Sequence, residues 1–205
     1  MVQKFEALKE SPSQTAGPYV HIGCTPNFVG NTGIYPEDLG TRMITGAAKG
    51  ARVTITGAVI DGNGTPLKDA MVEIWQADAA GLFNSPSETR GQADPHFTGW
   101  ARSPGDFDTG EFTFDTIKPG PVRLHDGRMQ APHITFWVVA RGINVGLQTR
   151  MYFPDEDAAN ATDPALNRIE HKDRIATLVA KSTGPGQYRF DIRLQGAGET
   201  VFFDI

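Results

Sequence analysis

The chain has 205 residues and a formal net charge of −5, from 24 acidic and 19 basic side chains. This length suffices for one domain with a substantial core, and the acidic balance argues against a nucleic-acid partner, which usually requires a basic face. Cys24 is the one cysteine, so the chain alone forms neither an internal disulfide nor a cysteine-based metal site, and a reducing cytoplasmic location fits best. The longest apolar run, at 136–140, is far shorter than the roughly 20 residues of a membrane span, so we expect no membrane anchor and no export signal.

The N-terminal quarter of the chain predicts an arm and a loop excursion. Residues 1–10 are compatible with a short helical turn, which Ser11-Pro12-Ser13 would end. Residues 15–19 have the composition of an extended, turn-rich segment, and 19–23 alternate like a short strand. Residues 27–50 are rich in Gly, Pro, Asn and Thr, which predicts an irregular excursion; in compact domains such excursions are usually functional or covered by a partner.

Two functions are open for the turn-rich arm. It is either a terminal loop packed on the domain or part of a pocket wall, to which Thr15 would contribute a hydroxyl, Gly17 its backbone and Tyr19 a phenol. The residues alone do not decide between these two interpretations.

The strongest β signal comes from two apolar, β-prone runs at 53–60 and 70–76, separated by Asp61-Gly62-Asn63-Gly64. The separating residues tolerate positive φ, so the pattern predicts strand, turn, strand, as in a hairpin. In the second run a tryptophan points to one side of the pleat and two aliphatic side chains point to the other. Both faces are therefore expected to be at least partly covered, as in a sandwich.

Further strand signals follow a loop-like stretch at 82–104. Residues 110–116 alternate, and the turn 118–121 follows them. Residues 133–140 are almost continuously apolar and predict a central strand buried on both faces. A further run spans 149–153.

The C-terminal third predicts the helices and a hairpin. Asp163 before Pro164 is typical of a helix N-cap and predicts one or two short helices, the only ones in the chain. Residues 177–182 and 187–194 predict a hairpin through Gly-Pro-Gly, and 200–205 an edge strand or a partner-facing arm. The fold class is mainly β: a sandwich of mixed and antiparallel strands with long loops, in one domain over 1–205 whose core is 51–205.

No local motif for chemistry is present. No two of the five histidines are spaced i,i+2 or i,i+4, and nucleophile-elbow and phosphate-loop sequences are absent. From composition and spacing alone, the sequence predicts no catalytic residue and no metal ligand set.

Longer stretches resemble a known family. TGAVIDGNGTPLKDAMVEIWQADAAG, FTFDTIKPGPV and APHITFWVVARGIN occur in this order and resemble the intradiol ring-cleavage dioxygenases. SPSQTAGPYVHIG near the start and YRFDIRLQGAGETVFFDI at the end extend the resemblance over nearly the whole chain. It implies a β-sandwich domain and a non-haem Fe(III) reaction that opens a catechol ring between its two hydroxylated carbons, with both atoms of O2 entering the product.

The chain departs from the iron-binding pattern of that family, in which two tyrosines and the histidines of an H-x-H pair hold the metal. Thr135 replaces one histidine of the pair His133-Ile134-Thr135, and Val122 stands where a tyrosine follows KPGP. Gln130 replaces an arginine, and no tyrosine lies between residues 35 and 152. We therefore expect no bound metal and interpret His133 as a structural core residue whose ring nitrogens are satisfied by hydrogen bonds.

The resemblance then implies a partner. A β chain of the same fold would carry Fe(III), the active site would lie between the two chains in a higher-order oligomer, and the substrates would be protocatechuate and O2. By the match, the residues of this chain that face the substrate are Thr15, Gly17, Pro18 and Tyr19 in TAGPY and Arg141 in ARGIN. Arg141 would place a permanent cation near a carboxylated dianion.

Alternatives remain open at this point. Arg141 could instead form an ion pair within or between chains, and Tyr19 could be a core residue. For the whole chain, the rivals are a self-sufficient catechol dioxygenase, which the missing ligands count against, and a non-catalytic β-sandwich binding module, which fold alone permits.

Overall fold

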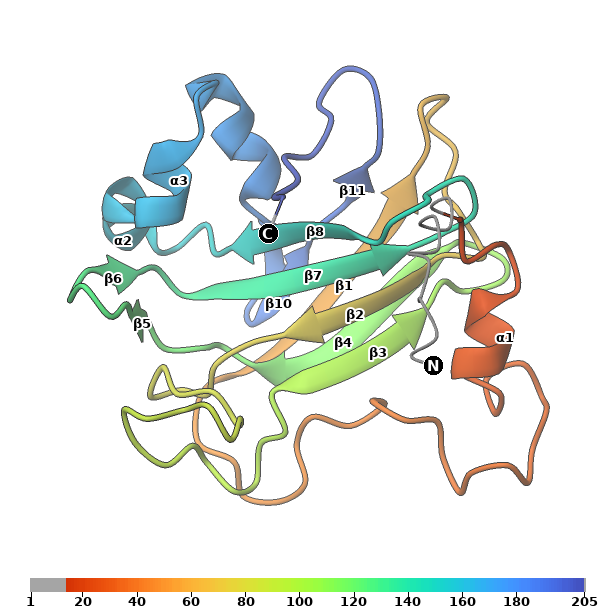
Figure 1. Ribbon diagram of the computed structural model, residues 1–205, viewed down its shortest axis with the longest axis horizontal. Coiled ribbons are helices and arrows are strands. Elements are labelled where there is room, and N and C mark those ends of the chain that lie inside the picture. The colour runs from red at the N-terminus through yellow and green to blue at the C-terminus, as the bar shows by residue number, and fades with distance from the viewer. Residues whose placement is uncertain (1–13, 205) are drawn as a thin grey trace, which may run out of the picture.

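The protein folds as two β-sheets packed face to face, with long loops and short helices at the two ends (Figure 1). The structure is a computed structural model and describes residues 14–204. The predicted helical turn at 1–10 and its end at Ser11–Ser13 lie outside the described residues. The predicted mixed and antiparallel β-sandwich is confirmed.

The first sheet has five strands and is built around β1 (Arg52–Ile60). β4 (Glu111–Ile117) pairs antiparallel along one edge of β1, and β10 (Gln187–Arg189) and β11 (Ile192–Arg193) pair parallel along the other. β9 (Lys181–Gly184) completes the sheet as an antiparallel partner of β10. The predicted Gly-Pro-Gly hairpin is thus confirmed, but its first strand begins at Lys181 and not at residue 177.

The second sheet has four antiparallel strands in the order β3-β2-β7-β8. Their bounds are β3 (Trp100–Pro104), β2 (Met71–Trp75), β7 (His133–Val139) and β8 (Leu147–Tyr152). Residues 71–75 of β2 lie opposite 139–135 of β7 in register. This register decides which loop residues meet where the two strands end.

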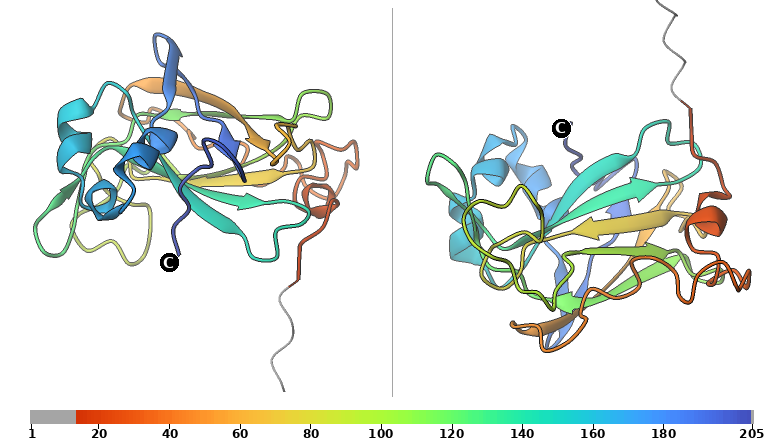
Figure 2. Two further views of the ribbon diagram at one scale, coloured as in Figure 1. Left: turned by 90° about the horizontal axis from the view of Figure 1, so that it is seen from above. Right: turned by 60° about the horizontal axis from the view of Figure 1, so that its bottom comes forward.

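The core lies between the sheets, whose two layers are separated in the left view of Figure 2. Phe136 of the second sheet is fully buried, and its ring centroid lies 5.9 Å from that of Phe112 and 5.1 Å from that of Phe190, both from the first sheet's side. The buried Gln76 side chain also joins the layers, because its Nε2 donates to Ile117 O at 2.9 Å and its Oε1 accepts from the Thr116 hydroxyl at 2.9 Å. Apolar packing and a satisfied polar bridge thus hold the sheets together.

Short elements flank the sandwich. α1 (Val20–Cys24) lies at one end, while α2 (Asp157–Thr162) and α3 (Pro164–Arg168) lie at the other, near the small β5–β6 hairpin (Figure 1). β5 is Val122–Arg123, β6 is Met129–Gln130, and a 3-10 helix spans Lys172–Leu178. None of the helices within residues 14–204 is long and apolar enough to cross a membrane.

The structure corrects the prediction of a hairpin at 53–76. β1 and β2 belong to different sheets, so the two runs do not pair with each other. The turn between them is real: the Asp61 carboxylate accepts the N–H groups of Asn63 and Thr65 at 2.9 and 2.8 Å. The chain then crosses from one layer to the other. Two apolar runs around a turn are compatible with either outcome, because only packing decides which strands pair.

Three local predictions were also wrong. Tyr19–Gly23 is not a strand, because the chain enters α1 there and has no neighbouring strand to pair with, so α1 and α2 add to the helices expected. β3 lies within the predicted loop at 82–104; its polar sequence forms a strand because β2 offers an open edge. β7 is central as predicted, but only one face is buried along its whole length; on the other face His133 is buried and Trp137 is 39% exposed.

Candidate functional site

The N-terminal arm is joined to the end of β7, far away in the sequence. The Thr15 hydroxyl donates a hydrogen bond to Ala140 O at 3.2 Å, across 125 residues. The Gly17 N–H lies 3.4 Å from the same hydroxyl, and Gly17 has φ of +80°, a conformation that side-chain-bearing residues rarely adopt. The structure thus brings the start of TAGPY next to the start of ARGIN.

The remaining TAGPY residues face outward. Pro18 is exposed, and Tyr19, which stands at the N-cap position of α1, is 74% exposed. The alternative that Tyr19 is a core residue is therefore wrong for this chain taken alone. Tyr19 and Arg141 are 74% and 60% exposed, so the predicted residues form an open surface in this chain.

Arg141 begins the turn after β7 and pairs with an acidic residue that the sequence did not single out. Its Nε lies 3.0 Å from Asp69 Oδ2, while 60% of the Arg141 side chain stays exposed. The intrachain ion pair left open by the sequence is thus present, yet most of the cation faces solvent. The β2–β7 register could have indicated Asp69, because continuing the pairing of Met71 with Val139 by two residues brings Asp69 opposite Arg141.

Arg141 also lines an open hollow of about 630 Å³ between three turns. Apolar side chains make much of its wall, and polar groups stand beside them; the residues include Asp61, Leu67, Ile143, Val145, Leu194 and Gln195. An apolar wall with one permanent cation suits a ligand that combines a ring with a carboxylate.

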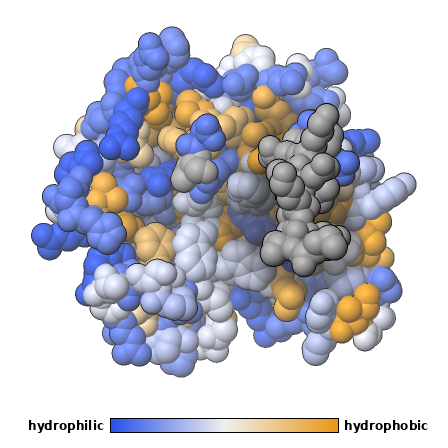
Figure 3. Space-filling model, viewed as in Figure 1, coloured by the Kyte–Doolittle hydropathy of each residue, from blue (hydrophilic) through white to orange (hydrophobic). Residues whose placement is uncertain are grey.

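An exposed apolar flank continues from the arm through α1 into the excursion at 27–50, which contains no named helix or strand, as predicted. The large side chains exposed there are Tyr19, Ile22, Phe28, Ile34, Tyr35 and Leu39. Figure 3 shows hydrophobic residues on this side of the molecule, toward the lower right. A partner that covers the excursion stays a prediction.

His133 is a buried core residue, as the sequence predicted. Its side chain lies in the core at the start of β7, and Nδ1 is 2.8 Å from Ala131 O. Burial first, and then the charge of Arg150, lower the pKa of His133 to about 4, so the imidazole is neutral at pH 7 and donates through Nδ1. The sequence-predicted hydrogen bonding is thus confirmed for one of the two ring nitrogens.

The other positions of the family's ligand pattern offer nothing that fits a ferric ion. Val122 on β5, where the pattern has a tyrosine, is apolar, and Thr135 on β7, where it has a histidine, has no ionisable group at physiological pH. Gln130 on β6, which replaces the arginine near that pair, is a neutral amide. Within residues 14–204, no three His, Cys, Asp or Glu side chains gather as a metal site would require. The residues present therefore do not fit the iron of the family.

A smaller hollow of about 330 Å³ lies beside these positions and is lined by Val122 and Gln130. The rings of Trp75 and Phe83 stack there, with centroids 5.9 Å apart and planes 7° from parallel. Glu88 and Arg90, an ion pair from a loop, also line this hollow, and Arg90 Nε donates to Glu88 Oε1 at 2.9 Å.

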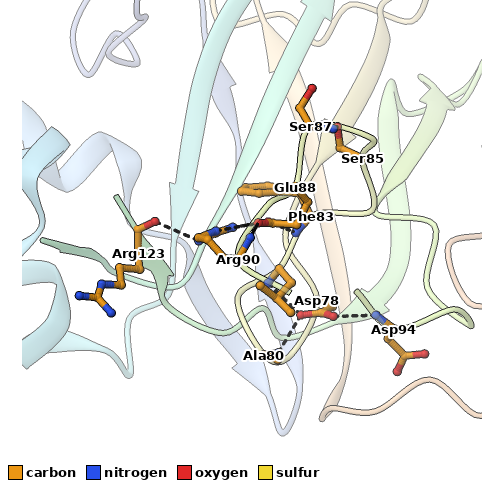
Figure 4. A network of polar contacts seen from close by, with 10 residues as sticks. Asp78, Ala80, Phe83, Ser85, Ser87, Glu88, Arg90, Asp94 and Arg123 are labelled. Carbon is orange, nitrogen blue, oxygen red and sulfur yellow. Dashed lines mark hydrogen bonds and ion pairs between the residues drawn. The ribbon is translucent and has the colours of Figure 1, made fainter. Parts of the chain in front are cut away.

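Loop contacts hold that ion pair in place (Figure 4). Glu88 Oε2 also accepts the Phe83 N–H at 3.0 Å, and Arg90 Nη1 donates to Arg123 O at 3.0 Å. Hydrogen bonding from Arg90 is the main cause that lowers the pKa of Glu88 to about 2. The charges of this network are thus neutralised within the chain. Sequence reasoning missed Glu88 and Arg90, because an i,i+2 acid–base pair in a loop is a weak signal.

Comparison with known proteins now adds the family. The sequence model of the family described as Dioxygenase matches residues 24–196, which is most of the chain. The chain belongs to the intradiol dioxygenase family.

Two relatives and one solved structure are similar to this chain over most of its length. It is 46% identical over 203 residues to the protocatechuate 3,4-dioxygenase alpha chain of Pseudomonas putida, covering 98% of both chains. It is 35% identical over 164 residues to the protocatechuate 3,4-dioxygenase beta chain of Burkholderia cepacia, covering 76% of this chain and 69% of that one. The dioxygenase domain of a carbohydrate-binding fusion protein from Streptomyces sp. SirexAA-E has 26% identity and a TM-score of 0.53, covering 78% of this chain and 88% of that chain.

Proposed function

We propose that this chain is the α subunit of a protocatechuate 3,4-dioxygenase and that an iron-bearing β chain of the same fold is its partner. The observation that carries the proposal is the His133-x-Thr135 pair, in which the one remaining histidine is buried and bonded to Ala131 O. A dioxygenase fold without a ligand set needs a partner that has one. The similarity to both an alpha and a beta chain supports such a pair.

In the assembly, this chain would form part of the substrate wall, and the redox step belongs to the partner. Arg141 would attract and orient the carboxylate of protocatechuate, because its guanidinium keeps its charge at any physiological pH. Thr15 and the backbone of Gly17 would hydrogen-bond to the substrate, while Pro18 offers a rigid apolar surface and Tyr19 a ring with a phenol. The product would be 3-carboxy-cis,cis-muconate.

The open geometry supports a wall completed by another chain. The TAGPY arm and the turn at Arg141 are tied together, yet Tyr19 and Arg141 remain 74% and 60% exposed. The apolar flank beside the arm would be covered in a higher-order αβ oligomer. A cytoplasmic location is part of the proposal, supported by the use of a single cysteine, Cys24, which has no partner in the chain for a disulfide.

Expression alone and with the β chain tests the proposal. We expect iron and protocatechuate-dependent O2 uptake only in the co-expressed complex, measured together with its size. Iron and turnover in the isolated chain would instead support a self-sufficient dioxygenase. A stable chain that never associates with the β chain would support a binding module.

The role of the wall is tested by Arg141→Ala in the complex. We expect a higher KM for protocatechuate or a slower turnover, with unchanged iron content, because the cation contacts the substrate and not the metal. Arg128→Ala is the control, since Arg128 is a similarly exposed arginine, 51% against 60%, that also pairs with a carboxylate but lies on the β5–β6 hairpin. Loss of iron in Arg141→Ala would contradict the assigned role.

A further inference from the structure

Asp69 lies directly opposite Arg141 when the β2–β7 pairing is continued past the strand ends. The strand register runs from Met71 opposite Val139 to Trp75 opposite Thr135. Asp69 precedes β2 by two residues and Arg141 follows β7 by two, so the antiparallel pairing brings them together. The ion pair between Arg141 Nε and Asp69 Oδ2, at 3.0 Å, is the direct result.

The two partners of this ion pair differ in their exposure. The Asp69 side chain is 13% exposed and that of Arg141 is 60% exposed, so the carboxylate is the fixed end and the guanidinium is the outer end. Asp69 Oδ1 is buried without a hydrogen-bond partner in the part of the chain that the structure describes. Arg141 is also the only cation in an ion pair with Asp69 there, so the buried carboxylate has one compensating charge.

The ion pair engages the guanidinium through Nε. Among residues 14–204, neither terminal NH2 group of Arg141 takes part in a hydrogen bond. Those two groups form the edge that binds a carboxylate through two parallel hydrogen bonds. The backbone beside Arg141 is fixed as well, because Ala140 O accepts the Thr15 hydroxyl.

We propose that Asp69 is a positioning residue for substrate binding: it holds Arg141 so that the terminal NH2 groups point outward to the substrate carboxylate. This inference rests on the proposed function and names a residue that the wall does not include. A long arginine side chain loses rotamer entropy when it binds a ligand, and a partner that orders it beforehand reduces this loss. Asp69 does not touch the substrate, so its effect is confined to ligands that use Arg141.

The test is Asp69→Asn in the co-expressed complex, which keeps the shape of the side chain and removes its charge. We expect KM for protocatechuate to rise about fivefold, the factor for losing a partly exposed ion pair, with kcat changed less than about twofold. The inhibition constant of unsubstituted catechol against protocatechuate turnover should stay unchanged, because catechol has no carboxylate. Asp126→Asn is the matched control, since it removes a carboxylate from the exposed pair with Arg128.

A double-mutant cycle separates positioning from a structural role. In the Arg141→Ala background, Asp69→Asn should add nothing to KM, because the residue through which it acts is gone. An unchanged KM in Asp69→Asn, an equal shift for catechol, additive effects in the double variant, or loss of iron or assembly would each overturn the proposal. If Arg141→Ala itself leaves KM unchanged, the proposed role of Arg141 in the wall fails first; if Arg141→Ala raises KM and Asp69→Asn does not, only the inference about Asp69 fails.

Discussion

The buried carboxylate of Asp163 should be the most sensitive polar group for stability, because it ties three segments together. Its Oδ1 accepts the N–H groups of Ala165 and Leu166 at 2.8 and 3.0 Å and the Tyr152 hydroxyl at 3.2 Å. Its Oδ2 accepts the Ala131 N–H at 2.8 Å. Burial is the main cause that raises the pKa of Tyr152, which therefore remains a neutral donor.

The loss of stability expected for Asp163→Ala can be worked out from these hydrogen-bond partners. Loss of the cap on α3 costs about 1 kcal/mol. The Ala131 N–H and the Tyr152 hydroxyl become buried donors without an acceptor, at roughly 1 to 3 kcal/mol each. We expect a total loss of about 4 kcal/mol. Asp163→Asn keeps the oxygen that accepts three of the four hydrogen bonds and presents an NH2 group to Ala131 N–H, so it should cost about 2 kcal/mol.

Chemical and thermal unfolding of the purified protein measure both variants. In a protein of this size, 4 kcal/mol corresponds to a lower Tm by about 8 to 16 °C. Asp126→Asn, at an exposed ion pair, is the control and should leave the midpoint unchanged. If Asp163→Ala unfolds like the wild type, or if Asp163→Asn is the more damaging of the two, the account of this network is wrong.

Three further predictions follow from single contacts. Thr15→Val removes the hydrogen bond to Ala140 O and should raise KM of the complex roughly threefold without changing its iron content, while Thr15→Ser should behave like the wild type. The pKa of His133 falls from 6.5 to about 4 on folding, so between these two pH values the unfolded chain binds more protons than the folded chain. The free energy of unfolding therefore decreases as the pH falls through this range, by at most about 1.4 kcal/mol per pH unit. A His133→Gln variant should lack this slope in urea unfolding at pH 5 to 7; an identical slope would refute the assignment. Gly57→Ala would place Cβ 1.9 Å from Phe190 O and should cost at least about 2 kcal/mol, measured in the same unfolding experiment; a wild-type midpoint would show that β1 can move away.

Much of the fold could be predicted because its signals are local. Alternation in β4, the apolar run of β7 and the Gly-Pro-Gly turn before β10 each specify an element within a few residues. The helix N-cap at Asp163 could also be predicted, because Pro164 follows it. Which strands pair within each sheet could not be predicted, because the sequence of one strand does not show which distant segment will lie beside it. The wrong prediction of a hairpin between β1 and β2 is an example.

Some features of the candidate site could likewise be predicted from the sequence, and others could not. The missing ligands at Val122 and Thr135 could be predicted from residue identities alone, since neither side chain offers the phenolate or imidazole of the family's pattern. The contacts of Arg141 could not be predicted from residue identities, because they depend on how the ends of β2 and β7 come into register.

The sequence by itself determined the chemical inventory: which side chains can carry charge, donate hydrogen bonds or bind metal, and which short runs favour strands or turns. Tertiary structure alone decided that the arm meets Ala140 through Thr15 and that Asp69 faces Arg141. The physical reason is that a side chain's identity is local, whereas burial, register and charge pairing depend on segments that become neighbours only when the two sheets close over one core.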